Sequence, residues 1–170
     1  MVGMAYGATV TEGTLWGVVF GVFICWIPLI FVALMVWRGR ISDIHMQHRR
    51  ERILPMVVTI ISSLAALWLV ATRDAPPVFY LLILIALVQI TLMLAITLFW
   101  QISMHTMSIT AAIIAMGTMF SMTAGLVLVP LIVLVAAARL NLKRHTPGQV
   151  LGGTVVGGIV PLIVLSILHT

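Results

Sequence analysis

The side chains that can do chemistry gather in three short polar stretches between long apolar runs, at residues 38–55, 100–106 and 138–149. These stretches hold four of the five histidines and eight of the nine lysines and arginines. Arginine offers paired hydrogen bonds to phosphate, and histidine exchanges protons near neutral pH. Because the stretches border apolar runs, they predict a site at a membrane surface for an anionic group, such as a phosphate or diphosphate on a lipid.

Three spacings in these stretches resemble the motifs of the type 2 phosphatidic acid phosphatase superfamily. Arg139, five intervening residues and His145 match the third motif of that family. Residues 103–105 (Ser-Met-His) are similar to the second motif, and Arg52 is similar to the arginine near the end of the first. The resemblance extends from about residue 38 to the end of the chain. It implies an all-α integral membrane six-helix bundle that is phosphatidic acid phosphatase type 2-like.

The resemblance also implies a mechanism. His145 would attack phosphorus and form a phosphohistidine, and His105 would protonate the leaving oxygen and later activate water. A set of polar side chains would bind the phosphoryl oxygens: Arg139, Arg52, Arg49 and Ser103. The implied substrate is a lipid or polyprenyl (di)phosphate, and the scheme needs no metal and no cofactor. Membrane lipids are the other expected partners, and nucleic acid is not expected.

Departures from the motifs leave a second interpretation open. Gln149 stands where the family has the aspartate that orients the nucleophilic histidine. Its amide can accept the imidazole N–H, but it carries no charge to stabilise an imidazolium. Ala138, Ile102 and Met104 replace three further motif residues. The alternative is a catalytically weak or inactive membrane protein of the same fold, which binds lipid or serves as a structural subunit of a larger membrane complex.

The composition determines which elements must position these residues. The chain has 170 residues, of which 62% are hydrophobic and 8% are charged. Surfaces that face water carry roughly 25–35% charged residues, so a soluble protein is excluded. Cys25 is the only cysteine, which excludes a disulfide scaffold. The sequence therefore predicts a single transmembrane domain over residues 1–170.

A helix crosses a bilayer with about 20 apolar residues. The segment at residues 102–141 is too long for one crossing, because a single helix of that length would measure about 60 Å. A break near residues 121–125 gives two crossings of nearly normal length. The six predicted spans are residues 15–37, 56–72, 78–100, 102–121, 124–141 and 149–168.

The distribution of charge supports six spans. Positive residues in short loops favour the cytoplasmic face. With six spans the basic loops at residues 38–55 and 138–149 share one face, and only Arg73 lies opposite. We therefore expect a multi-pass protein of the cell membrane with cytoplasmic basic loops and both termini outside. Four basic residues are expected to act only as anchors at anionic headgroups: Arg38, Arg40, Lys143 and Arg144.

Other functions have less support from the residues. His105 and His145 can act as haem ligands, but membrane haem ligands usually lie within spans, and these two lie at span ends. His45 and His48 lack carboxylate or cysteine partners for a metal site. A transporter is not supported, because no ionisable residue lies deep within a predicted span.

Small residues recur at four-residue spacing, which lets helices approach closely. The three pairs are Gly17 and Gly21, Gly148 and Gly152, and Gly153 and Gly157. We expect these faces to pack within the chain. A seam in a homo-oligomer is the alternative.

Overall fold

The computed structural model describes residues 10–42 and 49–168, and every regular element in these ranges is helical. The all-helical fold class expected from the sequence is confirmed. The described chain divides into two compact units. Residues 10–42 and 49–99 form an N-terminal unit, and residues 100–168 form a C-terminal unit.

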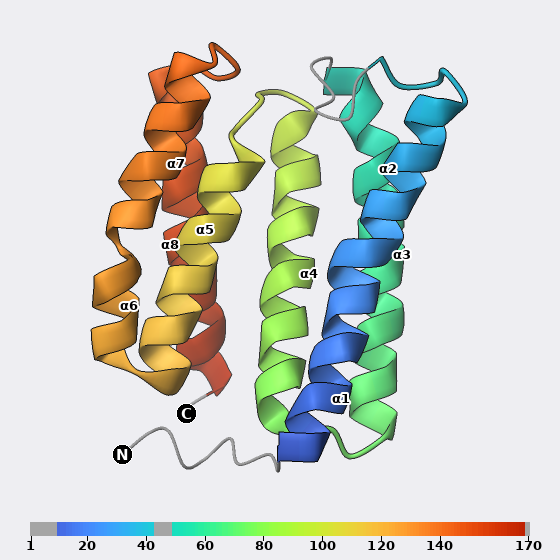
Figure 1. The fold of residues 1–170 in the computed structure, drawn as a ribbon, viewed down its shortest axis with the longest axis vertical. Helices are drawn as coiled ribbons and strands as arrows, with labels where there is room; N and C mark the ends of the chain where they lie inside the picture. The colour runs from blue at the N-terminus through green and yellow to red at the C-terminus, as the bar shows by residue number, and fades with distance from the viewer. Residues whose placement is uncertain (1–9, 43–48, 169–170) are drawn as a thin grey trace. The chain divides into compact units, whose positions relative to one another are not determined.

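Three long helical runs build the N-terminal unit (Figure 1). α1 continues through a π-helical segment into α2, and α3 and α4 form an antiparallel pair beside this run. Trp16, Ala66, Val70 and Ile83 form a buried core among these helices. The bounds are Val10–Phe20 for α1, Gly21–Trp26 for the π-helical segment, Ile27–Trp37 for α2, Arg49–Thr72 for α3 and Pro77–Thr97 for α4.

Within the described residues α3 begins at Arg49, well before the predicted span start at residue 56. The prediction stopped at Pro55 because proline usually interrupts a helix. In the structure Pro55 lies inside α3 and is buried together with Met56. The free energy gained by burying these apolar groups offsets the loss of the one main-chain hydrogen bond that a proline cannot make. Arg49 and Arg52 consequently lie on a helix and not in a loop.

The C-terminal unit contains the two segments that resemble the second and third motifs. α5 continues into a π-helical segment, α6 and α7 return along it, and α8 runs parallel to α5 (Figure 1). The bounds are Met104–Ala115 for α5, Met116–Phe120 for the π-helical segment, Met122–Leu128 for α6, Pro130–Asn141 for α7 and Pro147–Leu168 for α8.

The chain reverses at Ser121, whose φ of −156° and ψ of 122° are those of an extended residue. Ser121 caps α6, since its hydroxyl oxygen accepts a hydrogen bond from Ala124 N at 3.4 Å. Gly117 and Gly125 let the two segments on either side of Ser121 approach closely. A Cβ on Gly125 would lie 2.6 Å from the Cα of Gly117. The reversal falls in the segment where the sequence predicts a break between two spans.

Glycines of α8 let the backbones of α5 and α8 pack closely. A Cβ on Gly153 would collide with the main-chain oxygen of Ser103, and a Cβ on Gly157 would collide with that of Met107. Four residues further along α8, the contact lies four residues further along α5, which is the pattern of two parallel helices. The Gly153–Gly157 pair therefore packs within the chain, and it holds the start of α5 against α8.

Within the residues that the structure describes, five helical runs are long and apolar enough to cross a membrane: Thr11–Trp37, Arg49–Thr72, Pro77–Thr97, Met122–Asn141 and Pro147–Ile167. Many of their large apolar side chains are exposed, which suits contact with lipid. The chain is therefore a multi-pass membrane protein, as the composition predicts. A further apolar run, Met104–Phe120, is shorter than these five.

Candidate functional site

The loop that carries His145 begins at a tight turn at the end of α7. Lys143 N donates a hydrogen bond to Leu140 O at 2.9 Å, and Arg144 N donates one to Arg139 O at 3.1 Å. Both bonds use carbonyl groups that have no partner inside the helix, which is the pattern of a Schellman turn. This turn fixes the direction in which the chain leaves α7 and approaches α8.

α8 begins with a capping box formed by Thr146 and Gln149. Thr146 N donates to Gln149 Oε1 at 3.1 Å, and Gln149 N donates to Thr146 Oγ1 at 3.4 Å. Pro147 is the first helical residue. The N–H group at this position has no partner inside a helix, so a proline loses no hydrogen bond here. The box therefore fixes the Gln149 side chain next to the residue that follows His145.

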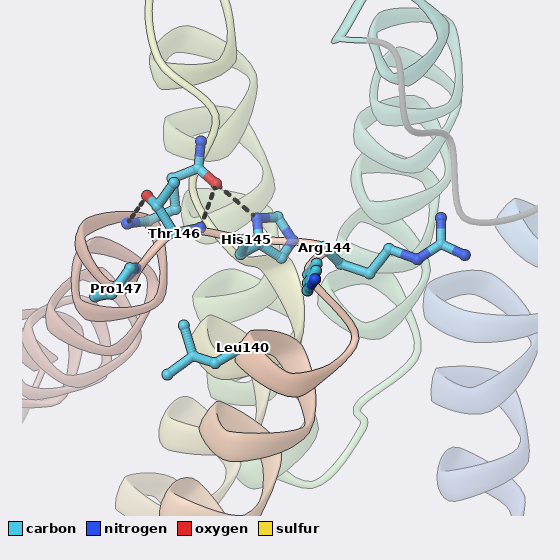
Figure 2. A pocket seen from close by; sticks show the side chains of 7 residues that line it. Leu140, Arg144, His145, Thr146 and Pro147 are labelled. Carbon is cyan, nitrogen blue, oxygen red and sulfur yellow. Dashed lines mark hydrogen bonds between the residues drawn. The ribbon is translucent and has the colours of Figure 1, made fainter.

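The same oxygen of Gln149 also contacts the imidazole. His145 Nδ1 lies 3.2 Å from Gln149 Oε1, as one of the dashed lines in Figure 2 marks. The backbone N–H of Thr146 donates to this atom, so the atom must be the amide oxygen, which only accepts. Nδ1 therefore carries a proton. In the neutral imidazole the lone pair then lies on Nε2, the atom that a nucleophilic histidine would use.

The start of α5 is tied to the first turn of α8. Ser103 N donates to the main-chain oxygen of Gln149 at 2.9 Å, and Thr106 Oγ1 donates to Val150 O at 3.1 Å. Ser103 is fully buried and caps α5, because its hydroxyl oxygen accepts from Thr106 N at 3.4 Å. His105 lies in the first turn of α5 and is exposed. The structure thus brings the starts of α5 and α8 together at one end of the C-terminal unit.

Arg139 lies in the last turn of α7. Its Nε atom is buried and has no hydrogen-bond partner among the described residues. A buried donor without a partner costs about 1–3 kcal/mol. This Nε–H group therefore lacks an acceptor within the described residues, and Arg139 is not part of the lining of the pocket that adjoins His145.

An open pocket of about 500 Å³ adjoins His145 (Figure 2). Lys143 and Arg144 contribute positive charge to its lining, and Leu140 and Pro147 contribute apolar wall. The positive end of the α8 dipole lies at the same place, because Thr146, Pro147 and Gln149 line the pocket too. Such a pocket suits an anionic group attached to an apolar chain.

Two further predicted site residues, Arg49 and Arg52, lie in the N-terminal unit. Arg49 Nη1 donates to Phe99 O at 3.1 Å, beyond the end of α4. Arg52, one turn further along α3, is only 7% exposed. Their role at a phosphate, like that of the buried Ser103 hydroxyl, stays a prediction. His45 and His48 lie outside the described residues.

Sequence reasoning nominated Gln149 as the residue that orients His145, and the structure places Gln149 Oε1 beside that ring. It missed the capping role of Thr146, although Thr-Pro-Gly-Gln at residues 146–149 carries the signature of a capping box. It also missed Thr106, because nothing in a sequence distinguishes a threonine that binds a neighbouring helix from one that faces lipid.

Comparisons of the chain with protein-family models, with curated proteins and with solved structures find no match.

Proposed function

We propose that the protein is a membrane-embedded phosphatase that hydrolyses a lipid or polyprenyl (di)phosphate through a phosphohistidine at His145. The hydrogen bond between His145 Nδ1 and Gln149 Oε1 carries the proposal, because it leaves Nε2 of the neutral ring with its lone pair. The basic and partly apolar lining of the adjoining pocket gives further support.

The proposed reaction has two steps. Nε2 of His145 attacks phosphorus while the bond to the leaving oxygen breaks, and His105 protonates that oxygen. His105 then takes a proton from water, the water oxygen displaces His145 from phosphorus, and inorganic phosphate leaves. Arg139 offsets the negative charge on the phosphoryl oxygens in both steps. No metal and no cofactor take part.

The remaining residues of the proposed phosphate site add positive charge and a hydroxyl group. Arg49 and Arg52 are the proposed contributors from α3, and Ser103 is the proposed contributor from the start of α5. Their assignment follows the resemblance of the motifs and does not depend on the contacts of His145.

Six membrane crossings are part of the proposal. Met104–Phe120 would be the sixth, close to the lower limit of about 17 residues for a crossing. The reversal at Ser121 and the return of the chain along α6 and α7 support this count. With six crossings the basic loops share one face, which the positive-inside rule assigns to the cytoplasm.

The experiment that tests the proposal is phosphate release from farnesyl monophosphate by the purified protein in detergent, with EDTA present. Wild type is expected to release phosphate, and His145→Ala is expected to lose about 10³-fold or more of the rate, because the nucleophile is absent. His169→Ala is the matched control, since His169 is no part of the proposed site. Equal release by wild type and His145→Ala, or none by wild type on a panel of lipid phosphates, contradicts the proposal.

One observation favours a second candidate, a non-catalytic lipid-binding or structural subunit of a larger membrane complex. Gln149 uses its side-chain oxygen to cap α8 as well as to contact His145, and it supplies no negative charge. This candidate predicts stoichiometric partners after gentle purification and no turnover. Phosphate release by the isolated chain excludes it.

A further inference from the structure

Lys143 has a backbone conformation that favours glycine. Its φ is 52°, in the left-handed region, at the position that closes the turn after α7. A side chain in this conformation crowds the next carbonyl group, and helices that end in this way usually have glycine here. The turn itself has no need of a lysine side chain, because main-chain groups make both of its hydrogen bonds. A lysine at a strained position beside a candidate site indicates a role for its amine.

Lys143 lines the same pocket as His145. The pocket is open and has a volume of about 500 Å³, which leaves room for more than one phosphoryl group. Arg144 lies between these two residues in the chain, and Figure 2 shows its side chain extending away from the His145 ring. Lys143 is therefore a better candidate than Arg144 for the positively charged group that acts beside His145.

We propose that Lys143 binds the inner phosphate of a diphosphate whose terminal phosphate is attacked by His145. This inference rests on the proposed function and names its substrate class as a lipid diphosphate. Leu140 and Pro147 in the pocket wall fit the apolar chain of such a substrate. A compact ammonium group suits a phosphate that must be bound but not transferred.

A lipid diphosphate reacts at its terminal phosphorus. A bond forms between Nε2 of His145 and the terminal phosphorus, and the bond from that phosphorus to the bridging oxygen breaks. The electron pair stays on the bridging oxygen, so the leaving group is the lipid monophosphate. Water then gives a proton to His105, which has lost its own to the leaving oxygen, and the water oxygen replaces Nε2 on phosphorus. Inorganic phosphate leaves, and His145 is restored.

A diphosphate also suits the neutral side chain of Gln149. Gln149 orients His145 but adds no charge, so the nucleophile is weaker than one held by a carboxylate. A phosphate monoester is a weaker base than an alkoxide, and it leaves with less help from an acid. The ammonium group of Lys143 offsets the charge that develops on the bridging oxygen and the inner phosphate. The choice of substrate thus compensates for the weaker nucleophile.

The experiment compares farnesyl diphosphate with farnesyl monophosphate as substrates of the full-length protein in detergent with EDTA. We expect wild type to have the higher kcat/KM on the diphosphate. Lys143→Gly is expected to lower the ratio of the two kcat/KM values about tenfold, the loss expected of one charge-assisted hydrogen bond. The same variant is expected to have a higher Tm, because glycine adopts a positive φ without strain. Misfolding cannot explain a variant that has a higher Tm but a weaker preference for the diphosphate.

Two further variants and one inhibitor test whether the charge of Lys143 itself is the cause. Lys143→Arg keeps the charge and is expected to retain the preference for diphosphate. Arg38→Gln removes one charge from the N-terminal unit, at an exposed residue outside the pocket lining, and the ratio is expected to stay at the wild-type value. Inorganic diphosphate, a soluble source of the same group, is expected to compete with the lipid about tenfold less well in Lys143→Gly than in wild type.

The outcomes separate the two claims. If wild type hydrolyses the monophosphate and Lys143→Gly changes neither the substrate ratio nor the competition, the role of Lys143 is overturned and the phosphatase function stands. A ratio that falls equally in Arg38→Gln also overturns it, because general positive charge would then explain the effect. If wild type turns over neither substrate, the phosphatase function is overturned, and the role of Lys143 with it.

Discussion

Two donors share the side-chain oxygen of Gln149: Thr146 N at 3.1 Å and His145 Nδ1 at 3.2 Å. The first hydrogen bond caps α8, and the second orients the imidazole of His145. At the scale of single residues, the stability of the first turn of α8 and the tautomer of His145 therefore depend on one atom. A carboxylate oxygen in the same place would accept both bonds and add a charge that stabilises a positive imidazole.

Gln149→Glu is therefore expected to raise the rate of phosphate release about tenfold, a gain of ~1.4 kcal/mol in transition-state stabilisation, with little change in Tm. Gln149→Leu has no acceptor for either bond, and it is expected to lose about 10²-fold in rate. Both rates come from the farnesyl monophosphate assay.

Thr146→Ala is the control for the capping part of this effect. It removes the hydroxyl that accepts from Gln149 N but leaves Gln149 Oε1 in place. We expect a loss of about 1 kcal/mol of stability and a rate near that of wild type. If Thr146→Ala and Gln149→Leu lose the same fraction of the rate, Gln149 acts only through the fold of α8.

Sequence reasoning reached part of this picture. The resemblance of Arg139, His145 and Gln149 to the third phosphatase motif implied that Gln149 orients His145, because Gln149 stands where that motif has its aspartate. The left-handed backbone at Lys143 was not predictable, because the usual sign of that conformation is glycine. The unpartnered Nε of Arg139 was also out of reach, since hydrogen-bond partners across helices depend on packing.

At the scale of helices, the site depends on the contact between α5 and α8. Ser103 and Thr106 bind the first turn of α8 through main-chain oxygens, and Gly153 leaves room for that contact. The parallel arrangement places the positive ends of two helix dipoles at one end of the C-terminal unit. Both ends favour an anion near His145.

Gly153→Ala is expected to destabilise the protein by ~1–3 kcal/mol, because its Cβ would collide with the backbone of Ser103, which cannot move without breaking the α5 contact. Thermal unfolding in detergent measures the effect. The rate of phosphate release is expected to fall as well, since the shift separates the starts of α5 and α8.

Gly17→Ala is the matched control for this substitution. It lies in another pair of glycines at four-residue spacing, but nothing stands within 4 Å of a Cβ at this position. Alanine there is expected to be neutral or to stabilise by about 0.5–1 kcal/mol, through helix propensity alone. An equal loss of Tm in both variants would show that the α5–α8 contact is not the cause.

The helices themselves were partly predictable from the sequence. The break near Ser121 followed from length, because a continuous helix over residues 102–141 would be about twice the thickness of the bilayer core. The start of α3 did not follow, since proline is a signal to end a helix and the burial of Pro55 is a tertiary effect. Hydrophobicity predicts which residues enter the membrane better than it predicts where a helix starts in a polar stretch.

At the scale of the whole molecule, the low charge content made a membrane protein the necessary conclusion, and the five long apolar helical runs in the described part of the chain agree with it. The number of crossings and their direction rest on finer observations. An even number of crossings puts the polar segments at residues 38–55 and 138–149 on one face, and both segments are basic.

Cysteine accessibility tests this topology. On a Cys25→Ser background, single cysteines in place of Met104 and Thr146 are expected to react with an impermeant thiol reagent only from the cytoplasmic side. Cysteines in place of Asp74 and Met122 are expected to react only from the opposite side. Labelling of positions 104 and 146 from different sides would contradict the account, because the starts of α5 and α8 must lie at one membrane face.

The most direct measurement is the identification of the residue that becomes phosphorylated during turnover. The protein is mixed with farnesyl diphosphate labelled at the terminal phosphate, quenched in alkali to preserve phosphohistidine, digested and sequenced by mass spectrometry. The account predicts label on His145, absent in His145→Ala and increased in His105→Ala, which lacks the group that activates water. Label on any other residue, or product formation with no covalent intermediate at His145, would contradict it.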